Sequence, residues 1–180
     1  MNSNLKSNRL VHICVAVITV CIISGSCHSS EGRSRCLRLN EIGLFSVPDT
    51  VFAHSDLECL DLGNDHFTMY PPLSALVDSS VNNLTRLPDS FHLLPKLKTL
   101  VLRGNRLEQL PLSIGSLANL ESLDLSFNSN LHIAEELTTI ARLKKLKVLN
   151  IVGVNTFRMN IDSITSVLGD KVEVIFKDGG

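Results

Sequence analysis

The chain has 180 residues and a formal net charge of −1; 44% of its residues are hydrophobic, only 4% are aromatic, and tryptophan is absent. This length suits one modest domain, whose core has to be built from aliphatic side chains. The near-neutral charge and the lack of any run of lysine or arginine exclude a protein that attracts nucleic acid through a strong positive field.

Residues 1–27 are predicted to be a secretory signal peptide with an approximate cleavage point. Lys6 and Arg9 precede an apolar run over residues 10–23, and small residues follow at 24–26. This order is typical of a secretory signal, and the run is too short to span a membrane comfortably. We therefore expect a secreted or extracellular protein without a membrane span in the mature chain. A signal-anchored membrane protein and a cytoplasmic protein with a fortuitous apolar leader are the alternatives.

The five cysteines do not form a disulfide-rich framework. Cys14 and Cys21 lie in the leader, Cys27 lies near the cleavage point, and only Cys36 and Cys59 are clearly in the mature domain. Two cysteines are too few for a disulfide scaffold. No CxxC or HxxxH spacing suggests a metal site, and we expect no cofactor.

Residues 36–180, which follow a linker or weak N-terminal cap at 28–35, carry a leucine repeat. The clearest copies begin at Leu97 and Leu120, and both read LxxLxLxxN. A leucine-based period of 20–29 residues indicates a solenoid of stacked coils, each with one short strand. We expect about six coils, followed by a last edge strand at residues 172–176.

The pattern also predicts which side chains point inwards. In each strand the leucines face the core and the residues between them face outwards. The asparagine that ends the phrase is expected to turn inwards, where its carboxamide can bind backbone groups. The predicted structural ladder consists of Asn82, Asn105 and Asn128. Asp65 takes the asparagine place in the second coil, and Ile42 and Val154 take it in the first and sixth coils.

The third coil is irregular. Pro71 and Pro88, which end comparable phrases, are closer together in the chain than Leu97 and Leu120, and residues 74–81 contain no LxxLxL phrase. We predict a distorted coil at about residues 74–96 that keeps the bend at 82–84. The alternative is a repeat that has lost part of its sequence.

Two helices are predicted on the outer side of the last coils. Between residues 134 and 145, Leu137, Ile140 and Leu143 recur at helical spacing, with acidic residues first and basic residues last, as the helix dipole favours. A second, short helix is expected at residues 162–168, with an aspartate at its start and a glycine after its end.

The phrase LxxLxLxxNxLxxLPxxIxxL, clearest over residues 84–128, resembles the leucine-rich repeat family. Its short, proline-bearing form is similar to that of Ras-pathway scaffold and Ras-suppressor leucine-rich repeat proteins. The resemblance implies an α/β fold: a right-handed solenoid with short parallel strands on the concave face and loops and short helices on the convex face. It also implies a non-catalytic module that binds a protein or peptide partner. Because that subclass is usually cytosolic, a cytosolic regulator or scaffold of signalling enzymes, in a small GTPase or phosphatase pathway, is the alternative.

The outward places of the strands form the candidate partner-binding face, since surface display is what a solenoid offers. The candidates are Arg38, Asp61, Thr99, Val101, Arg103, Ser122, Asp124 and Asn150. For each of them an ordinary solvated position is the alternative. No catalytic residues are assigned, because no set of convergent titratable groups is evident. The open ends of so short a stack would be covered by a homodimer or by further repeats of a longer receptor.

Two further features depend on the compartment. Cys36 and Cys59 occupy the same register on adjacent strands, so their Cα atoms should lie about 4.8 Å apart, close enough for a disulfide in an oxidising compartment; free thiols are the alternative. Asn83 begins Asn83-Leu84-Thr85, the one N-glycosylation sequon in the chain, and is an expected glycan site only if the protein is secreted.

Overall fold

The computed structural model describes residues 35–65, 81–156 and 161–177. The predicted signal peptide and almost all of the predicted linker lie outside these residues, as does the first part of the predicted third coil.

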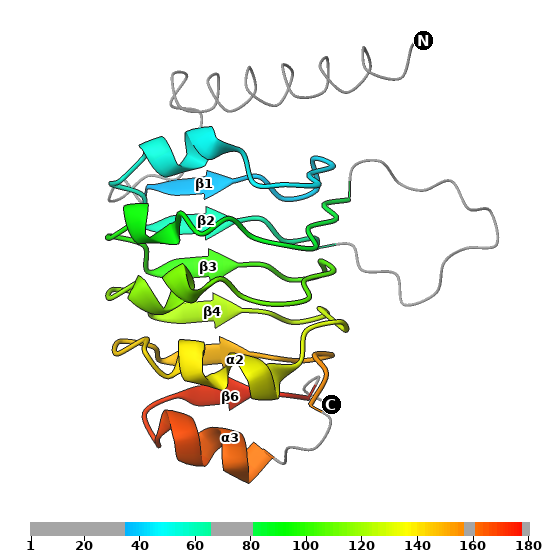
Figure 1. The fold of residues 1–180 in the computed structure, drawn as a ribbon, viewed down its shortest axis with the longest axis vertical. Helices are drawn as coiled ribbons and strands as arrows, with labels where there is room; N and C mark the ends of the chain where they lie inside the picture. The colour runs from blue at the N-terminus through cyan, green and yellow to red at the C-terminus, as the bar shows by residue number, and fades with distance from the viewer. Residues whose placement is uncertain (1–34, 66–80, 157–160, 178–180) are drawn as a thin grey trace, which may run out of the picture. The chain divides into compact units, whose positions relative to one another are not determined.

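Six short strands form one parallel sheet whose spatial order is the order of the chain. The strands are β1 (Cys36–Arg38), β2 (Cys59–Asp61), β3 (Thr99–Val101), β4 (Ser122–Asp124), β5 (Val148–Asn150) and β6 (Glu173–Ile175). The central residue of each strand faces its counterpart, so Leu60 pairs with Leu100 and Leu100 with Leu123. Figure 1 shows the strands as a ladder of parallel arrows. The predicted α/β repeat architecture and the last edge strand are confirmed.

Short helices and 3-10 turns return the chain from one strand to the next and lie along one side of the sheet (Figure 1). They are η1 (Asp49–Ala53), η2 (Phe91–Leu93), η3 (Leu112–Ser116), α2 (Ile133–Ile140) and α3 (Ile161–Leu168). Both predicted helices are present, but α2 ends before Leu143. There, the N–H groups of Arg142 and Leu143 bind carbonyls three residues earlier, and this tighter turn leads the chain into β5.

The core is a stack of aliphatic side chains. Leu60, Leu100, Leu123 and Leu149, at the centres of four successive strands, are completely buried. Two aromatic rings reinforce the first coils: Phe52 and Phe91 meet edge to face with ring centroids 5.3 Å apart. Since each coil covers the apolar side of its neighbour, the strands hold their outward side chains at fixed spacing.

The predicted third coil at residues 74–96 is wrong, because β2 pairs directly with β3 and leaves no place for a strand between them. Residues 82–96 instead complete the coil that begins with β2. That coil starts at Leu57 and the next starts at Leu97, so it is much longer than the regular coil that runs from Leu97 to Leu120. The additional residues are 65–81, which follow the strand.

The asparagine ladder shows the same register. Asn105 Nδ2 donates to the carbonyls of Leu102 and Leu62 at 2.9 and 3.0 Å, and its Oδ1 accepts from the Leu84 N–H at 3.0 Å. Asn128 makes the equivalent bonds one coil later, to Leu125, Leu102 and Leu107.

Asn82 fills this place in the coil of β2. Its Nδ2 donates to the carbonyls of Leu62 and Leu39 at 3.1 and 2.7 Å, and its Oδ1 accepts from the Leu44 N–H at 2.9 Å. The prediction that Asp65 takes the asparagine place in the second coil is therefore wrong. Asp65 is exposed, because the additional residues separate it from the position that its spacing suggested.

Candidate functional site

The residues that alternate with the buried leucines form one continuous surface, which we call the open face. Within each of the four strands β2 to β5, the central residue is buried and its two neighbours are half-buried. The strand register aligns these neighbours in two rows. The first row is Cys36, Cys59, Thr99, Ser122 and Val148, and the second row is Arg38, Asp61, Val101, Asp124 and Asn150. Seven of the eight candidate binding residues lie in these rows, and Arg103 follows Val101 at the next outward place.

Three side chains of the second row brace the backbone at the ends of their strands. Asp61 Oδ1 accepts from the Gly63 N–H at 3.0 Å, Asp124 Oδ1 accepts from the Ser126 N–H at 2.9 Å, and Asn150 Oδ1 accepts from the Val152 N–H at 3.2 Å. Each of these bonds spans two residues, as in an Asx turn. Both aspartates use only one carboxylate oxygen in this way, which leaves the other for a ligand.

The charge of Asp61 is poorly compensated. Burial raises the pKa of Asp61 above its ordinary value, and the nearby carboxylates of Asp65 and Asp124 raise it further. The Gly63 N–H and the more distant charge of Arg38 act in the opposite direction without overcoming these effects. A cation that approached this part of the open face would therefore be attracted and would favour the ionised form of Asp61.

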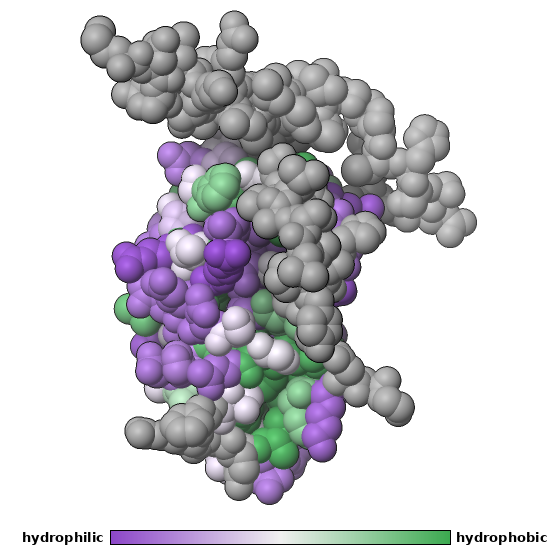
Figure 2. All heavy atoms as spheres, turned by 90° about the vertical axis from the view of Figure 1, so that its right-hand side faces the viewer, coloured by the Kyte–Doolittle hydropathy of each residue, from purple (hydrophilic) through white to green (hydrophobic). Residues whose placement is uncertain are grey.

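Arg103 lies beside this acidic region, on the side where the strands end. Its Nη2 donates to the Asp65 carbonyl at 3.3 Å, and its guanidinium carbon lies 5.9 Å from the centroid of the Phe127 ring. Phe127 has a positive φ of 57°, and its ring packs so closely on Gly153 that a Cβ there would come within 2.9 Å of it. Figure 2 shows this side of the molecule: hydrophobic residues gather over its lower part, the C-terminal coils.

A row of alternating charges precedes the strands. Lys98 Nζ lies 2.8 Å from Glu58 Oε2, and Lys147 Nζ lies 2.6 Å from Glu121 Oε2. These lysines lower the pKa of the two glutamates, mainly through the hydrogen bonds. Since the charges compensate one another, this row offers less to a partner than the open face does. This row was not predicted from the sequence, although glutamate and lysine alternate at the second place of the repeat phrase.

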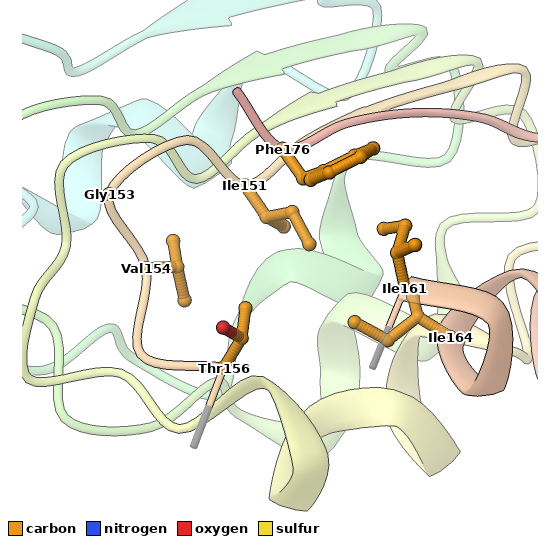
Figure 3. A pocket seen from close by; sticks show the side chains of 7 residues that line it. All are labelled: Ile151, Gly153, Val154, Thr156, Ile161, Ile164 and Phe176. Carbon is orange, nitrogen blue, oxygen red and sulfur yellow. The ribbon is translucent and has the colours of Figure 1, made fainter. Parts of the chain in front are cut away.

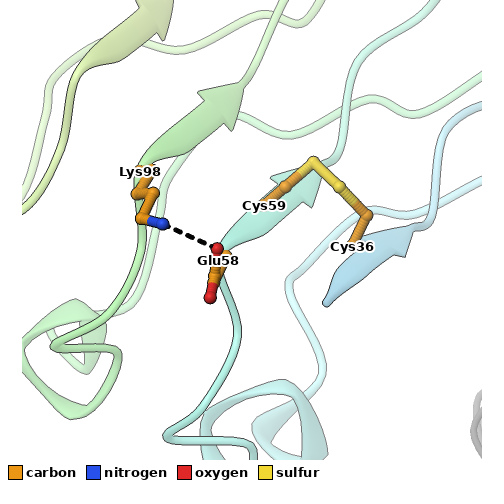
Figure 4. Close-up of a disulfide and its surroundings, with 4 residues drawn as sticks. All are labelled: Cys36, Glu58, Cys59 and Lys98. Carbon is orange, nitrogen blue, oxygen red and sulfur yellow. Dashed lines mark hydrogen bonds and ion pairs between the residues drawn. A yellow bond between two sulfur atoms is a disulfide. The ribbon is translucent and has the colours of Figure 1, made fainter. Parts of the chain in front are cut away.

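The first two strands are joined covalently. Cys36 and Cys59 form a disulfide, with their Cα atoms 4.3 Å apart, although they are separated by 23 positions in the chain (Figure 4). The bond lies at the N-terminal end of the first row, next to the Glu58–Lys98 pair. It fixes the first two strands against each other and gives this end of the first row an apolar surface.

The C-terminal coils contain a pocket of about 180 Å³ that is lined mainly by apolar side chains (Figure 3). Its wall includes Ile151, Val154, Thr156, Ile161, Ile164 and Phe176. None of the lining residues that the structure describes has a titratable side chain. In the part of the chain that the structure describes, no group of three or more histidine, cysteine, aspartate or glutamate side chains could hold a metal ion.

None of the helices in the described ranges is both long enough and apolar enough to cross a membrane.

Comparison with known proteins agrees with this architecture. A family model described as leucine-rich repeats in two copies matches residues 95–139, which contain β3 and β4. The chain is 36% identical over 118 residues to an adenylate cyclase of Schizosaccharomyces pombe. The matched region covers 62% of this chain and 7% of that protein. It is 34% identical over 152 residues to the volume-regulated anion channel subunit LRRC8E of Xenopus tropicalis, covering 79% of this chain and 18% of the subunit.

A third relative is Receptor like protein 21 of Arabidopsis thaliana, 38% identical over 81 residues, which covers 41% of this chain and 8% of the receptor. The chain thus spans less than a fifth of the length of these relatives.

Among solved structures, the plant peptide hormone receptor RGFR1 in complex with RGF2 is 20% identical with a TM-score of 0.41, covering 73% of this chain and 22% of that one. The Leptospira interrogans protein LIC12759 is 18% identical with a TM-score of 0.30, and the match covers 80% of this chain and 54% of that one.

The fold and the open face define a repeat solenoid that displays a surface. The chain is a leucine-rich repeat protein.

Proposed function

We propose that this protein binds a protein or peptide partner across the open face of its sheet and that it does so outside the cell, without catalysis. Leucine-rich repeat domains generally mediate protein–protein interaction, and the open face is the surface that this fold presents. The observation that carries the proposal is the alignment of two half-buried rows over consecutive strands.

The second row indicates how a partner would lie. Adjacent strands are about 4.8 Å apart, so Asp61 and Asp124, which flank Val101, are separated by about 10 Å. An extended segment that crosses the strands would meet an acidic, an apolar and a second acidic position in turn. The hydroxyls of Thr99 and Ser122, in the neighbouring row, have no hydrogen-bond partner among the described residues and are available to polar groups of the same segment.

The extracellular part of the proposal rests on the predicted signal peptide and on the Cys36–Cys59 disulfide, since disulfides persist in oxidising compartments. The similarity to a receptor-like plant protein supports it. The alternative is a cytosolic regulator of signalling enzymes, which the similarity to the repeat region of an adenylate cyclase favours. A homodimer, proposed from the open ends of the stack, is compatible with both.

The binding proposal is tested with peptides selected from a random displayed library on the full chain. Asp61→Asn together with Asp124→Asn removes two negative charges while an oxygen remains to accept from Gly63 and Ser126. We expect the selected peptides to lose at least about tenfold in affinity, about 1.4 kcal/mol. The matched control is Glu108→Gln together with Asp170→Asn, which removes two exposed negative charges outside the rows and should leave the affinity unchanged. Equal affinities for both double variants would contradict the proposal.

The compartment is tested separately. The full chain with a C-terminal tag should accumulate in the culture medium and lack the N-terminal leader when its mass is measured. Retention in the cytosol with an intact N-terminus would overturn the extracellular part and leave the cytosolic alternative.

A further inference from the structure

Two neighbouring asparagines have opposite surroundings. Asn82 is 1% exposed and its carboxamide binds backbone groups of two coils. Asn83, the next residue, is half-buried, and its carboxamide has no hydrogen-bond partner among the described residues. Its backbone N–H donates to the Leu44 carbonyl at 2.6 Å, which fixes the main chain at this point. Asn83 is thus held in place by its backbone, whereas its side chain is not needed by the fold.

The residues after Asn83 complete an acceptor sequence for N-glycosylation. Leu84 is completely buried, and Thr85 is exposed. Leu84, the middle residue of the sequon, therefore packs in the core, while Asn83 and Thr85 on either side of it face outwards. Among all 180 residues, Asn83-Leu84-Thr85 is the one stretch that meets the N-x-[ST] requirement.

The stacking of the coils leaves room beside Asn83. The Asn83 N–H binds the Leu44 carbonyl, and the Arg106 N–H binds the Leu84 carbonyl at 2.9 Å. These bonds place Asn83 between Gly43 of the coil before it and Arg106 of the coil after it. Gly43 has no side chain, and Arg106 is exposed and can rotate away. Among the residues that the structure describes, a sugar attached to Asn83 Nδ2 would therefore displace no packed side chain.

We propose that Asn83 carries an N-linked glycan. Asn83 Nδ2 would form a bond to the anomeric carbon of an oligosaccharide carried on a polyprenyl diphosphate, through the transferase of the secretory lumen. The bond between that carbon and the diphosphate oxygen breaks, the carboxamide loses one proton, and the diphosphate carrier leaves. The transfer involves no oxidation or reduction.

This inference rests on the extracellular part of the proposed function. The lumen in which the transfer takes place is also the compartment in which the Cys36–Cys59 bond forms. Asn83 lies outside both rows of the open face, so the glycan would leave the proposed binding surface free.

The experiment uses the full chain expressed in secreting animal cells, with four versions compared by mobility and by peptide mapping. The unmodified chain and Thr85→Ser, which keeps the sequon, should both carry one glycan that peptide-N-glycosidase removes, with conversion of Asn83 to aspartate. Asn83→Gln and Thr85→Ala should both lack it. All four versions should keep the same unfolding transition after deglycosylation, because the exchanged side chains lie outside the core.

If the unmodified chain reached the medium and its mobility did not change on treatment with the glycosidase, the glycan proposal would be overturned, while the extracellular proposal would stand. A chain that stays in the cytosol without modification would overturn both. A mobility shift that persists in Asn83→Gln would also contradict the assignment. Binding of the selected peptides to the Asn83→Gln chain is the independent readout, and it should match that of the unmodified chain.

Discussion

The side chain of Asn64 binds the backbone of Asn82 twice. Asn64 Nδ2 donates to the Asn82 carbonyl at 2.9 Å, and Asn64 Oδ1 accepts from the Asn82 N–H at 2.8 Å. The same Nδ2 lies 2.7 Å from the Gly104 carbonyl of the next coil. The two asparagines are 18 positions apart in the chain, yet they close the coil of β2 as neighbours would. The additional residues 65–81 are therefore attached to a coil that is already complete.

Deletion of residues 65–81 should leave a folded protein. Asn64 would then precede Asn82 directly, in the place that Gly104 occupies before Asn105, and asparagine tolerates the left-handed backbone found there. We expect the free energy of unfolding to be retained or raised by up to about 2 kcal/mol, since a shorter connection between Leu62 and Leu84 costs less entropy to close. Urea denaturation followed by circular dichroism measures this.

Deletion of residues 82–98, a segment of the same length, is the matched control for that variant. It removes Asn82, the buried Phe91 and the chain that leads to β3, so cooperative unfolding should be lost. If the 65–81 deletion behaved like this control, the assignment of an insertion would be refuted.

Asn82→Leu should destabilise the protein by about 2–4 kcal/mol, because it leaves the Leu39 carbonyl and the Leu44 N–H buried without a partner. Asp65→Ala should change the free energy of unfolding by less than about 0.5 kcal/mol, as is usual for exposed positions. Equilibrium denaturation of the two variants separates the observed register from the one that the regular repeat spacing suggested. If Asp65→Ala lowered the free energy of unfolding more than Asn82→Leu, Asp65 and not Asn82 would hold the asparagine place of this coil.

This difference shows what the sequence could predict. The spacing of the leucines placed five strands, the edge strand and the shared register of Cys36 and Cys59, because identical coils have to stack with identical side chains inwards. It failed between Leu62 and Leu84, because the phrase that ends at Pro71 and the one that ends at Pro88 suggest two separate coils, whereas β2 pairs directly with β3. The hydrogen bonds of Asn64 and Asn82, which decide the register, join positions that no local pattern connects.

The candidate site was predictable in its rows but not in its electrostatics. Alternation along a strand identifies Asp61 and Asp124 as outward residues. It does not say that Asp61 is half-buried with a raised pKa, nor that Phe127 supports Arg103. These properties depend on the distances between three coils.

Two carboxylates should respond to pH in opposite directions. The pKa of Asp61 is raised by burial, so its ionisation costs stability above that pKa, and the cost disappears below the pKa of the unfolded chain. The pKa of Glu58 is lowered by Lys98, so its contribution is present above the unfolded pKa and is lost as pH falls through the folded value.

Asp61→Asn should therefore stabilise the protein more, or destabilise it less, at about pH 7 than at about pH 3, and Glu58→Gln should be more destabilising at the higher pH. Guanidinium titrations at both pH values give the two differences, each measured against the unmodified chain. Changes of the same sign in both variants would contradict the environments assigned to these carboxylates.

Gly153→Ala should destabilise the protein by about 2 kcal/mol or more. Its φ of 67° strains any side chain, and the added Cβ would also lie 2.9 Å from Phe127 Cδ1. Gly169→Ala is the matched control, since Gly169 has a φ of 80° but no atom within 4 Å of an added Cβ. The difference in thermal unfolding between the two variants isolates the contact with Phe127. Equal losses would show that the Phe127 ring moves aside freely and does not support Arg103.

Loss of the Cys36–Cys59 disulfide should lower the free energy of unfolding by about 3 kcal/mol, the chain-entropy value for a loop closed over 23 positions. The double variant Cys36→Ala, Cys59→Ala should show this loss in the absence of reductant, and dithiothreitol should lower the stability of the unmodified chain by a similar amount without affecting the variant. The core around Leu37 and Leu60 stays intact in both cases, so unfolding should remain cooperative. If the unmodified chain gave the same denaturation curve with and without reductant, the two thiols would be free in solution. The proposed oxidising compartment would then lose the support of the disulfide.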